Sequence, residues 1–272
     1  MKVFISLDME GCAGTYSWNQ DDQKREEVRE LMTRQLKWVI KGIQSSVKND
    51  KIDEIVIADS HNCCDSIKYD ISRVDDRIFL ISGGMRPHSM MEGVQNCDVA
   101  FLVGYHAGMS AIQASMDHTY SSSLIKVCFN GKNMNETLIN SAVAGYYNVP
   151  VALVIGDEAL KQEVFAADAM PWVEYVATKQ AITRFSSKFY PYEIVKQNTI
   201  AGVCRALSGD LKTLPIYKFV GKTTASVEYP STDRADHAAL LPYSKRIDGR
   251  TVEFADDNFM TVFRAFLLMT SL

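Results

Sequence analysis

Short apolar runs that end in polar residues recur along this chain. They are residues 3–7, 54–58, 78–81, 99–103, 125–129 and 151–155. A short apolar run that is bounded by turn residues is typical of a buried strand. The run at residues 125–129 is followed by Asn130-Gly131, which is a strong turn signal. The pattern therefore predicts a set of short strands with their polar residues at the carboxyl ends.

Amphipathic segments lie between these runs. In residues 21–47, apolar side chains recur at steps of three and four among charged ones, which predicts a helix. Residues 135–147 predict another helix, and Pro150 prevents its continuation. Because strands alternate with helices, we expect an α/β fold with three αβα layers around a largely parallel central sheet.

The last hundred residues, roughly, carry a second group of elements. The pattern predicts helices near residues 191–207 and 257–269, and strands near residues 224–229 and 250–254. No segment rich in proline or glycine marks a boundary. We therefore expect one domain over residues 1–272, with a smaller C-terminal α/β subdomain from about residue 171 to residue 272.

Composition and charge narrow the class of protein. Hydrophobic residues make up 47% and charged residues 23%, as in an ordinary globular protein. The net charge is −4, and no basic cluster with interleaved aromatics predicts a nucleic-acid partner. The acidic N-terminal segment does not resemble a signal peptide, and no apolar run is long enough to predict a membrane partner. The six cysteines lack C-x-x-C spacing, which favours reduced thiols in the cytoplasm over a cysteine zinc site.

Candidate metal ligands follow three of the predicted strands. Asp8 and Glu10 are two residues apart, so an extended backbone places both carboxylates on one side. His61 and His106 each follow an apolar run, and neutral imidazole is the commonest metal ligand. Taken alone, such a carboxylate pair more often faces water, and such a histidine more often makes ordinary hydrogen bonds. Three strand ends that deliver ligands to one edge favour a metal site.

Two further residues are candidates with weaker local signals. Glu136 lies in the first turn of a predicted helix, where the helix dipole favours a carboxylate even without a metal. His118 lies in an irregular stretch between strands, and such loops commonly carry catalytic groups. His88 and His237 have no comparable setting, and we interpret them as structural.

The motifs that contain these residues form an ordered set. They are Asp8-Met9-Glu10-Gly11, Asp59-Ser60-His61, Ile81-Ser82-Gly83, Met90-Met91-Glu92-Gly93, Gly104-Tyr105-His106-Ala107 and Ala144-Gly145-Tyr146-Tyr147. In this order they resemble the D-aminopeptidase family, peptidase family M55. The resemblance continues through Lys179-Gln180 to Leu268-Met269-Thr270 and so covers nearly the whole chain.

The resemblance implies a site with two Zn²⁺ ions per chain. Its metal ligands would be Asp8, Glu10, His61, His106 and Glu136. Asp8 would bridge the two ions, with Glu10 and His106 completing one site and His61 and Glu136 the other. His118 would be the catalytic histidine, moving a proton or holding the oxyanion. The surrounding Met116-Asp117-His118-Thr119 departs from the M-S-H-S that is usual in the family.

The implied activity is hydrolysis of short peptides with a free N-terminal D-amino acid, of the D-Ala-D-Ala type. Members of the family form decameric rings, so the resemblance also implies a homo-oligomer. Alternatives are a metallo-aminopeptidase or amidase of L or mixed specificity, a two-metal phosphoesterase, and a non-catalytic metal-binding protein. The order of the motifs argues against the phosphoesterase, and His118 favours an enzyme. Residue spacing does not report chirality, which depends on the shape of the pocket.

Overall fold

The main body of the protein is built on a seven-stranded sheet. The computed structural model describes residues 1–271. The strand order is β3-β2-β1-β4-β7-β8-β9. The strands are β1 (Lys2–Leu7), β2 (Glu54–Asp59), β3 (Ile78–Ile81), β4 (Val99–Tyr105), β7 (Val151–Asp157), β8 (Glu174–Thr183) and β9 (Ser186–Phe189). All neighbours pair in parallel except β8 and β9, which are antiparallel. The largely parallel central sheet is therefore confirmed.

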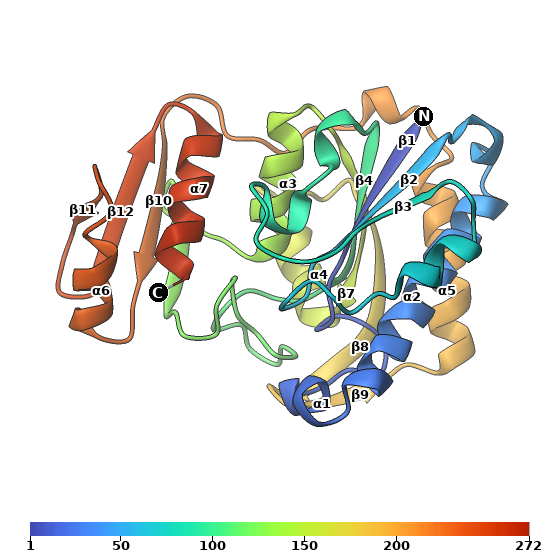
Figure 1. Ribbon diagram of the computed structural model, residues 1–272, viewed down its shortest axis with the longest axis horizontal. Coiled ribbons are helices and arrows are strands. Elements are labelled where there is room, and N and C mark those ends of the chain that lie inside the picture. The colour runs from blue at the N-terminus through green and yellow to red at the C-terminus, as the bar shows by residue number, and fades with distance from the viewer. Residues whose placement is uncertain (272) are drawn as a thin grey trace.

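Helices cover both faces of this sheet (Figure 1). One face packs against α2 (Arg25–Ser45) and α5 (Tyr192–Ala206), and the other against α3 (Glu136–Tyr146) and α4 (Glu158–Val164). Every residue of β4 and β7 is buried, as expected of strands covered on both sides. This arrangement confirms the three αβα layers.

The helix predicted from about residue 21 is two helices in the structure. The first, α1 (Trp18–Gln23), begins three residues earlier than expected and is followed by α2 after Lys24. Ser17 caps α1 in a capping box with Gln20, which explains the early start.

A second, five-stranded antiparallel sheet has the order β11-β12-β10-β5-β6. Its strands are β5 (Lys126–Phe129), β6 (Lys132–Asn133), β10 (Thr223–Glu228), β11 (Lys245–Arg246) and β12 (Thr251–Asp256). The helices of this region are α6 (Thr232–Ala238) and α7 (Phe259–Thr270). In Figure 1, α7 lies between the second sheet and α3. One apolar cluster joins these parts, with Phe129, Ile139 and Phe266 all fully buried.

The second sheet differs from the subdomain expected from about residue 171. β8, β9 and α5 follow that position but belong to the main body, because β8 pairs in parallel with β7. The second sheet instead recruits β5 and β6 from the middle of the chain. They form a hairpin whose turn residues, Asn130 and Gly131, both have positive φ, as the Asn-Gly signal predicts.

The remaining helical elements are short 3-10 turns. They are η1 (Asn49–Lys51), η2 (Tyr69–Arg73), η3 (Ser89–Met91), η4 (Val94–Asn96) and η5 (Leu211–Thr213). Among residues 1–271, none of the helices combines the length and the apolar character that crossing a membrane requires.

Candidate active site

Three strand ends meet at the carboxyl edge of the main sheet. β1 lies between β2 and β4, so the residues that follow these strands are neighbours. His61 Nδ1 lies 3.4 Å from Asp8 Oδ1, and His106 Nε2 lies 3.6 Å from Asp8 Oδ2. The structure thus brings together the side chains that the sequence pattern placed at strand ends.

Two glycines let the segment from Asp8 to Glu10 lie directly against the end of β4. Gly104 has a φ of 76°, and a Cβ there would come within 2.0 Å of the Asp8 carbonyl oxygen. A Cβ on Gly11 would come within 1.8 Å of the Tyr105 carbonyl oxygen. No L side chain fits such contacts without moving the backbone. Glycine at both positions therefore allows the two carboxylates to approach His106.

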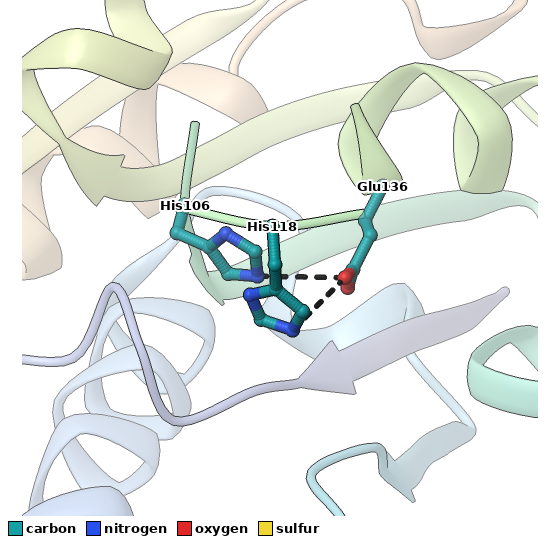
Figure 2. A group of neighbouring side chains, drawn as sticks. All are labelled: His106, His118 and Glu136. Atoms are coloured by element: carbon teal, nitrogen blue, oxygen red, sulfur yellow. Dashed lines mark ion pairs between the residues drawn. The ribbon is translucent and has the colours of Figure 1, made fainter. Parts of the chain in front are cut away.

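Glu136 and His118 complete the cluster from the other side. Glu136 is the first residue of α3, whose N-cap is Asn135, and its Oε1 accepts a 2.7 Å hydrogen bond from the Tyr120 backbone N–H. This oxygen lies 3.6 Å from His106 Nε2 and 3.4 Å from His118 Nε2. Figure 2 shows the two imidazoles face to face beside Glu136, with ring centroids 4.2 Å apart.

The cluster has the donor atoms that a metal site requires. Within residues 1–271, Glu10 Oε2 and His106 Nε2 are buried and have no hydrogen-bond partner. Such an unsatisfied group costs about 1–3 kcal/mol, a cost that metal coordination removes. His106 Nδ1 lies 3.0 Å from the Ala107 carbonyl oxygen, so an N–H donated there leaves Nε2 free to bind a metal. Three carboxylates and two imidazoles are oxygen and nitrogen ligands that zinc accepts, so the residues present fit this metal.

The contact distances group the ligands differently from the expected pairing. His61 Nδ1 lies 3.2 Å from Glu10 Oε2 as well as near Asp8, whereas His106 contacts Asp8 and Glu136. Asp8, Glu10 and His106 also offer atoms within 4.8 Å of one another, but the shorter contacts place His61, not His106, beside Glu10. The physical reason is strand order: β2 and β4 flank β1, so the two histidines approach Asp8 from opposite sides.

Burial and close charges shift the protonation of the cluster. Burial, together with the neighbouring Glu10 carboxylate, raises the pKa of Asp8 to about 8. Burial alone would lower the pKa of His106, but the carboxylates of Glu136, Glu10 and Asp8 together outweigh it and raise the pKa to about 10. Buried carboxylates that lie close together stay ionised only where positive charge near them offsets burial and their mutual repulsion. Divalent cations bound here would supply that charge and keep all three carboxylates ionised.

Burial lowers the pKa of the His118 imidazole, and a positive charge on His106 lowers it further. Its Nδ1 lies 2.9 Å from the Met116 carbonyl oxygen, which orients the ring. An N–H donated there leaves Nε2 as the free nitrogen, and this atom faces Glu136 at the active-site cavity. A neutral imidazole held in this way can accept a proton.

Sequence reasoning missed two residues of α1 that support the ligands. Trp18 Nε1 donates a 2.7 Å hydrogen bond to Glu10 Oε1, and its ring meets the His118 ring edge-on at 5.4 Å. Asp21 Oδ2 lies 3.3 Å from His61 Nε2, whereas the carboxylates of Asp8 and Glu10 lie near Nδ1 on the other side of the ring. A carboxylate in this position fixes the orientation of a ligand histidine. The available signal was the S-x-x-Q capping box from Ser17, which places Trp18 and Asp21 one helical turn apart on the same face.

A third missed residue, Lys179, stabilises the loop that carries Glu10. Its Nζ is fully buried and donates to the backbone carbonyl oxygens of Glu10 and Thr15 and to Thr15 Oγ1. Among the described residues it forms no ion pair, and burial lowers its pKa to about 8. The ammonium therefore holds the loop through neutral acceptors alone.

A cavity of about 440 Å³ opens over the cluster. Asp8, Glu10, His61, His118 and Glu136 line it, together with Trp18, Asp21 and Asp22. Five carboxylates line this space, and no lysine or arginine of the described chain does. The cavity is therefore suited to cations, including the ammonium group of a ligand.

A parallel α/β sheet with carboxylates and imidazoles at its carboxyl edge, beside a cavity that a further histidine faces, defines a metal-dependent hydrolase. The family model described as D-aminopeptidase, peptidase M55, matches residues 1–268. A D-aminopeptidase from Bacillus subtilis (strain 168) is 29% identical over 277 residues, which cover 100% of this chain and 97% of that protein. A solved structure, the Zn-dependent D-aminopeptidase DppA from Bacillus subtilis, described as a self-compartmentalizing protease, is also similar. It has a TM-score of 0.91 and 27% identity, over 100% of this chain and 97% of that one.

The chain therefore belongs to the D-aminopeptidase family, peptidase family M55, and is a metallopeptidase. The resemblance found in the ordered motifs is confirmed.

Proposed function

We propose that the protein is a two-zinc aminopeptidase that hydrolyses short peptides with a free N-terminal D-amino acid, of the D-Ala-D-Ala type. The observation that carries this proposal is the convergence of five oxygen and nitrogen side chains, of which Asp8, Glu10, His61 and Glu136 line an acidic cavity and His106 lies buried behind them. The zinc dependence of the solved relative supports the choice of metal, and the family supports the D-stereochemistry.

The proposed ligand sets follow the contact distances. Asp8, Glu10 and His61 would hold one ion, and Asp8, His106 and Glu136 the other, with Asp8 shared. When bound, a pair of zinc ions polarises the scissile carbonyl and lowers the pKa of the attacking water. Trp18 and Asp21 orient the ligands of the first set.

His118 is the proposed catalytic histidine. Its ring is fixed by the Met116 carbonyl, stacks on His106 and borders the cavity. From this position Nε2 can accept a proton from the attacking water and return it to the leaving amine. A positioned acid-base group of this kind contributes about 10²–10⁴-fold to a rate.

The cavity also favours a substrate with a free amino terminus. The carboxylates that line it, which include the exposed Asp22 at its edge, attract an ammonium group. Acetylation of the substrate amine removes that charge, so we expect N-acetylated peptides to bind weakly.

The experiment that tests this function compares D-Ala-D-Ala with L-Ala-L-Ala and with N-acetyl-D-Ala-D-Ala on zinc-loaded protein. The D-dipeptide should have the highest kcat/KM. Equal or higher values for the L-dipeptide would leave a metallo-aminopeptidase of L or mixed specificity. No turnover of any peptide would favour the non-catalytic metal-binding protein.

Elemental analysis tests the metal count separately. We expect close to two zinc ions per chain, with activity lost on chelation and restored by zinc. Full turnover with no more than one ion per chain would contradict the two-zinc proposal.

We also propose that the chain assembles into a homo-oligomer, a decameric ring by resemblance to the family. The description of the solved relative as self-compartmentalizing supports assembly. Analytical ultracentrifugation at micromolar concentration should show a species much larger than the 30.5 kDa chain. A monomer would contradict the proposal. A cytoplasmic location stays a prediction from cysteine usage and the N-terminal sequence.

A further inference from the structure

A second cavity adjoins the active-site cavity and carries the opposite charge. Both are lined by Asn62, Cys64, Ser89 and Tyr120, so the two spaces are continuous at these residues. The second cavity has a volume of about 600 Å³ and lies between the segment after β3 and the helix α7. No carboxylate among the described residues lines it, and its charged residues are Arg86 and Arg264.

Neither arginine forms an ion pair within the described part of the chain. Arg86 donates to the carbonyl oxygens of Asp59, at 2.7 Å, and Ile81, at 3.4 Å, and lies 3.1 Å from Cys64 Sγ. Arg264 is exposed on α7 and forms no ion pair with residues 1–271. Glu92, an acidic residue of the same region, is bound instead by His88. Two guanidinium groups without a carboxylate provide a site for an anion.

Part of the wall of the second cavity is apolar. Met85 is 93% exposed and Leu268 is 54% exposed, and Pro87 and Leu267 also line the space. Large exposed apolar side chains that gather in a concave site commonly mark a ligand surface. A ligand that combines an apolar group with an anion therefore fits this cavity.

We propose that the second cavity binds the carboxyl-terminal end of the peptide substrate, with Arg264 and Arg86 facing its α-carboxylate. This inference rests on the aminopeptidase function proposed above. A free peptide carries an ammonium group at one end and a carboxylate at the other, and the two joined cavities present acidic and basic groups in the same order. The charge order favours this direction of the bound chain, because Asp21 and Asp22, which line the first cavity outside the proposed ligand sets, attract the ammonium end and repel the carboxylate end. The substrate class is then free short peptides with an apolar C-terminal residue.

The test uses peptides of two to four residues that begin with D-Ala and end with leucine, each as the free acid and as the C-terminal amide. For the length that reaches the arginines, wild-type protein should cleave the acid with a kcat/KM about tenfold higher than the amide, mainly through KM. This factor corresponds to about 1.4 kcal/mol. Arg264→Gln should abolish the preference and keep the turnover of the amides, and Arg264→Lys should retain part of the preference.

Arg73→Gln is the matched control, because Arg73 is an exposed arginine on η2 that does not line either cavity. It should leave the preference unchanged. Equal cleavage of acid and amide by wild-type protein at every length would overturn the inference, as would an unchanged preference in Arg264→Gln. Slower cleavage of acids and amides by the same factor in Arg264→Gln would also overturn it, since this is the result of a purely structural role.

Calorimetric binding separates this inference from the proposed reaction. Acid peptides should bind about tenfold more tightly than amides, and Arg264→Gln should remove the difference. Selective binding without turnover would count against the peptidase activity alone. Turnover without any acid preference would count against the carboxylate site alone.

Discussion

Replacing Trp18 with phenylalanine tests whether the indole N–H supports zinc binding through Glu10. The hydrogen bond from Trp18 Nε1 to Glu10 Oε1, 2.7 Å long, is the one that the described structure provides to this carboxylate. Hydrogen bonds to charged groups contribute about 1.5–3 kcal/mol, and Trp18 is half-buried, so the lower value applies. Each 1.4 kcal/mol is a factor of ten, and loss of a group that orients a metal ligand typically weakens metal binding about 10–100-fold.

We therefore expect Trp18→Phe to weaken zinc binding at one of the two sites about tenfold. The measurement is a competition titration against a chelator of known affinity, which resolves a weaker and a tighter ion. Trp172→Phe is the matched control, because Trp172 Nε1 is buried with no hydrogen-bond partner among residues 1–271. The control should bind zinc like the wild type. Unchanged zinc affinity in Trp18→Phe, with a folded protein by circular dichroism, would refute the reasoning.

Three further predictions test the remaining assignments. Asp8→Ala should lose more zinc than Glu10→Ala by elemental analysis, because Asp8 contacts both ligand sets; equal loss would contradict a shared ligand. His118→Ala should keep its zinc and lose about 10²–10⁴-fold in kcat, and a nearly normal kcat would remove His118 from the chemistry. Burial lowers the pKa of Lys179 from 10.5 to about 8, so the unfolded chain binds more protons between these values. Unfolding free energy should therefore rise with pH across this window, and Lys179→Met should flatten that rise in urea titrations at pH 8 and pH 10; an equal rise in both proteins would contradict it.

The strands of the main sheet were predictable wherever both faces are covered. The runs that became β1, β2, β4 and β7 are apolar because helices pack on both sides of them. β8 was not predicted. Its second half pairs with the exposed edge strand β9 and is partly exposed, so its sequence mixes polar and apolar residues and lacks a clear strand pattern. The apolar run that became β5 was predicted as a strand, but its local pattern carries no information about which sheet it joins.

The candidate ligands Asp8, Glu10, His61 and His106 were visible in the sequence because parallel strands place their carboxyl ends at one edge. Glu136, on a helix, depended on the resemblance to the family. The grouping of the ligands was not visible, because it depends on the order β2-β1-β4, which puts His61 and His106 on opposite sides of Asp8. The contact between Asp21 and His61 joins residues 40 positions apart, and the contact between Lys179 and Glu10 spans 169. Local periodicity reports only on residues a few positions apart, so it does not predict contacts between residues this far apart in the sequence.

The hairpin of β5 and β6 has a consequence for biosynthesis. The hairpin lies on the segment between His118 and Glu136. Besides β6, the strand β5 pairs with β10, which follows about 100 residues later in the chain. Two strands alone are marginally stable in water, and the hairpin gains its partner strand only after β10 has left the ribosome. The N-terminal half of a nascent chain can form β1, β2 and β4 with the candidate ligands that follow them, yet the hairpin between His118 and Glu136 still lacks its strand partner. A peptidase built in this way stays incomplete until translation of its own chain is nearly finished.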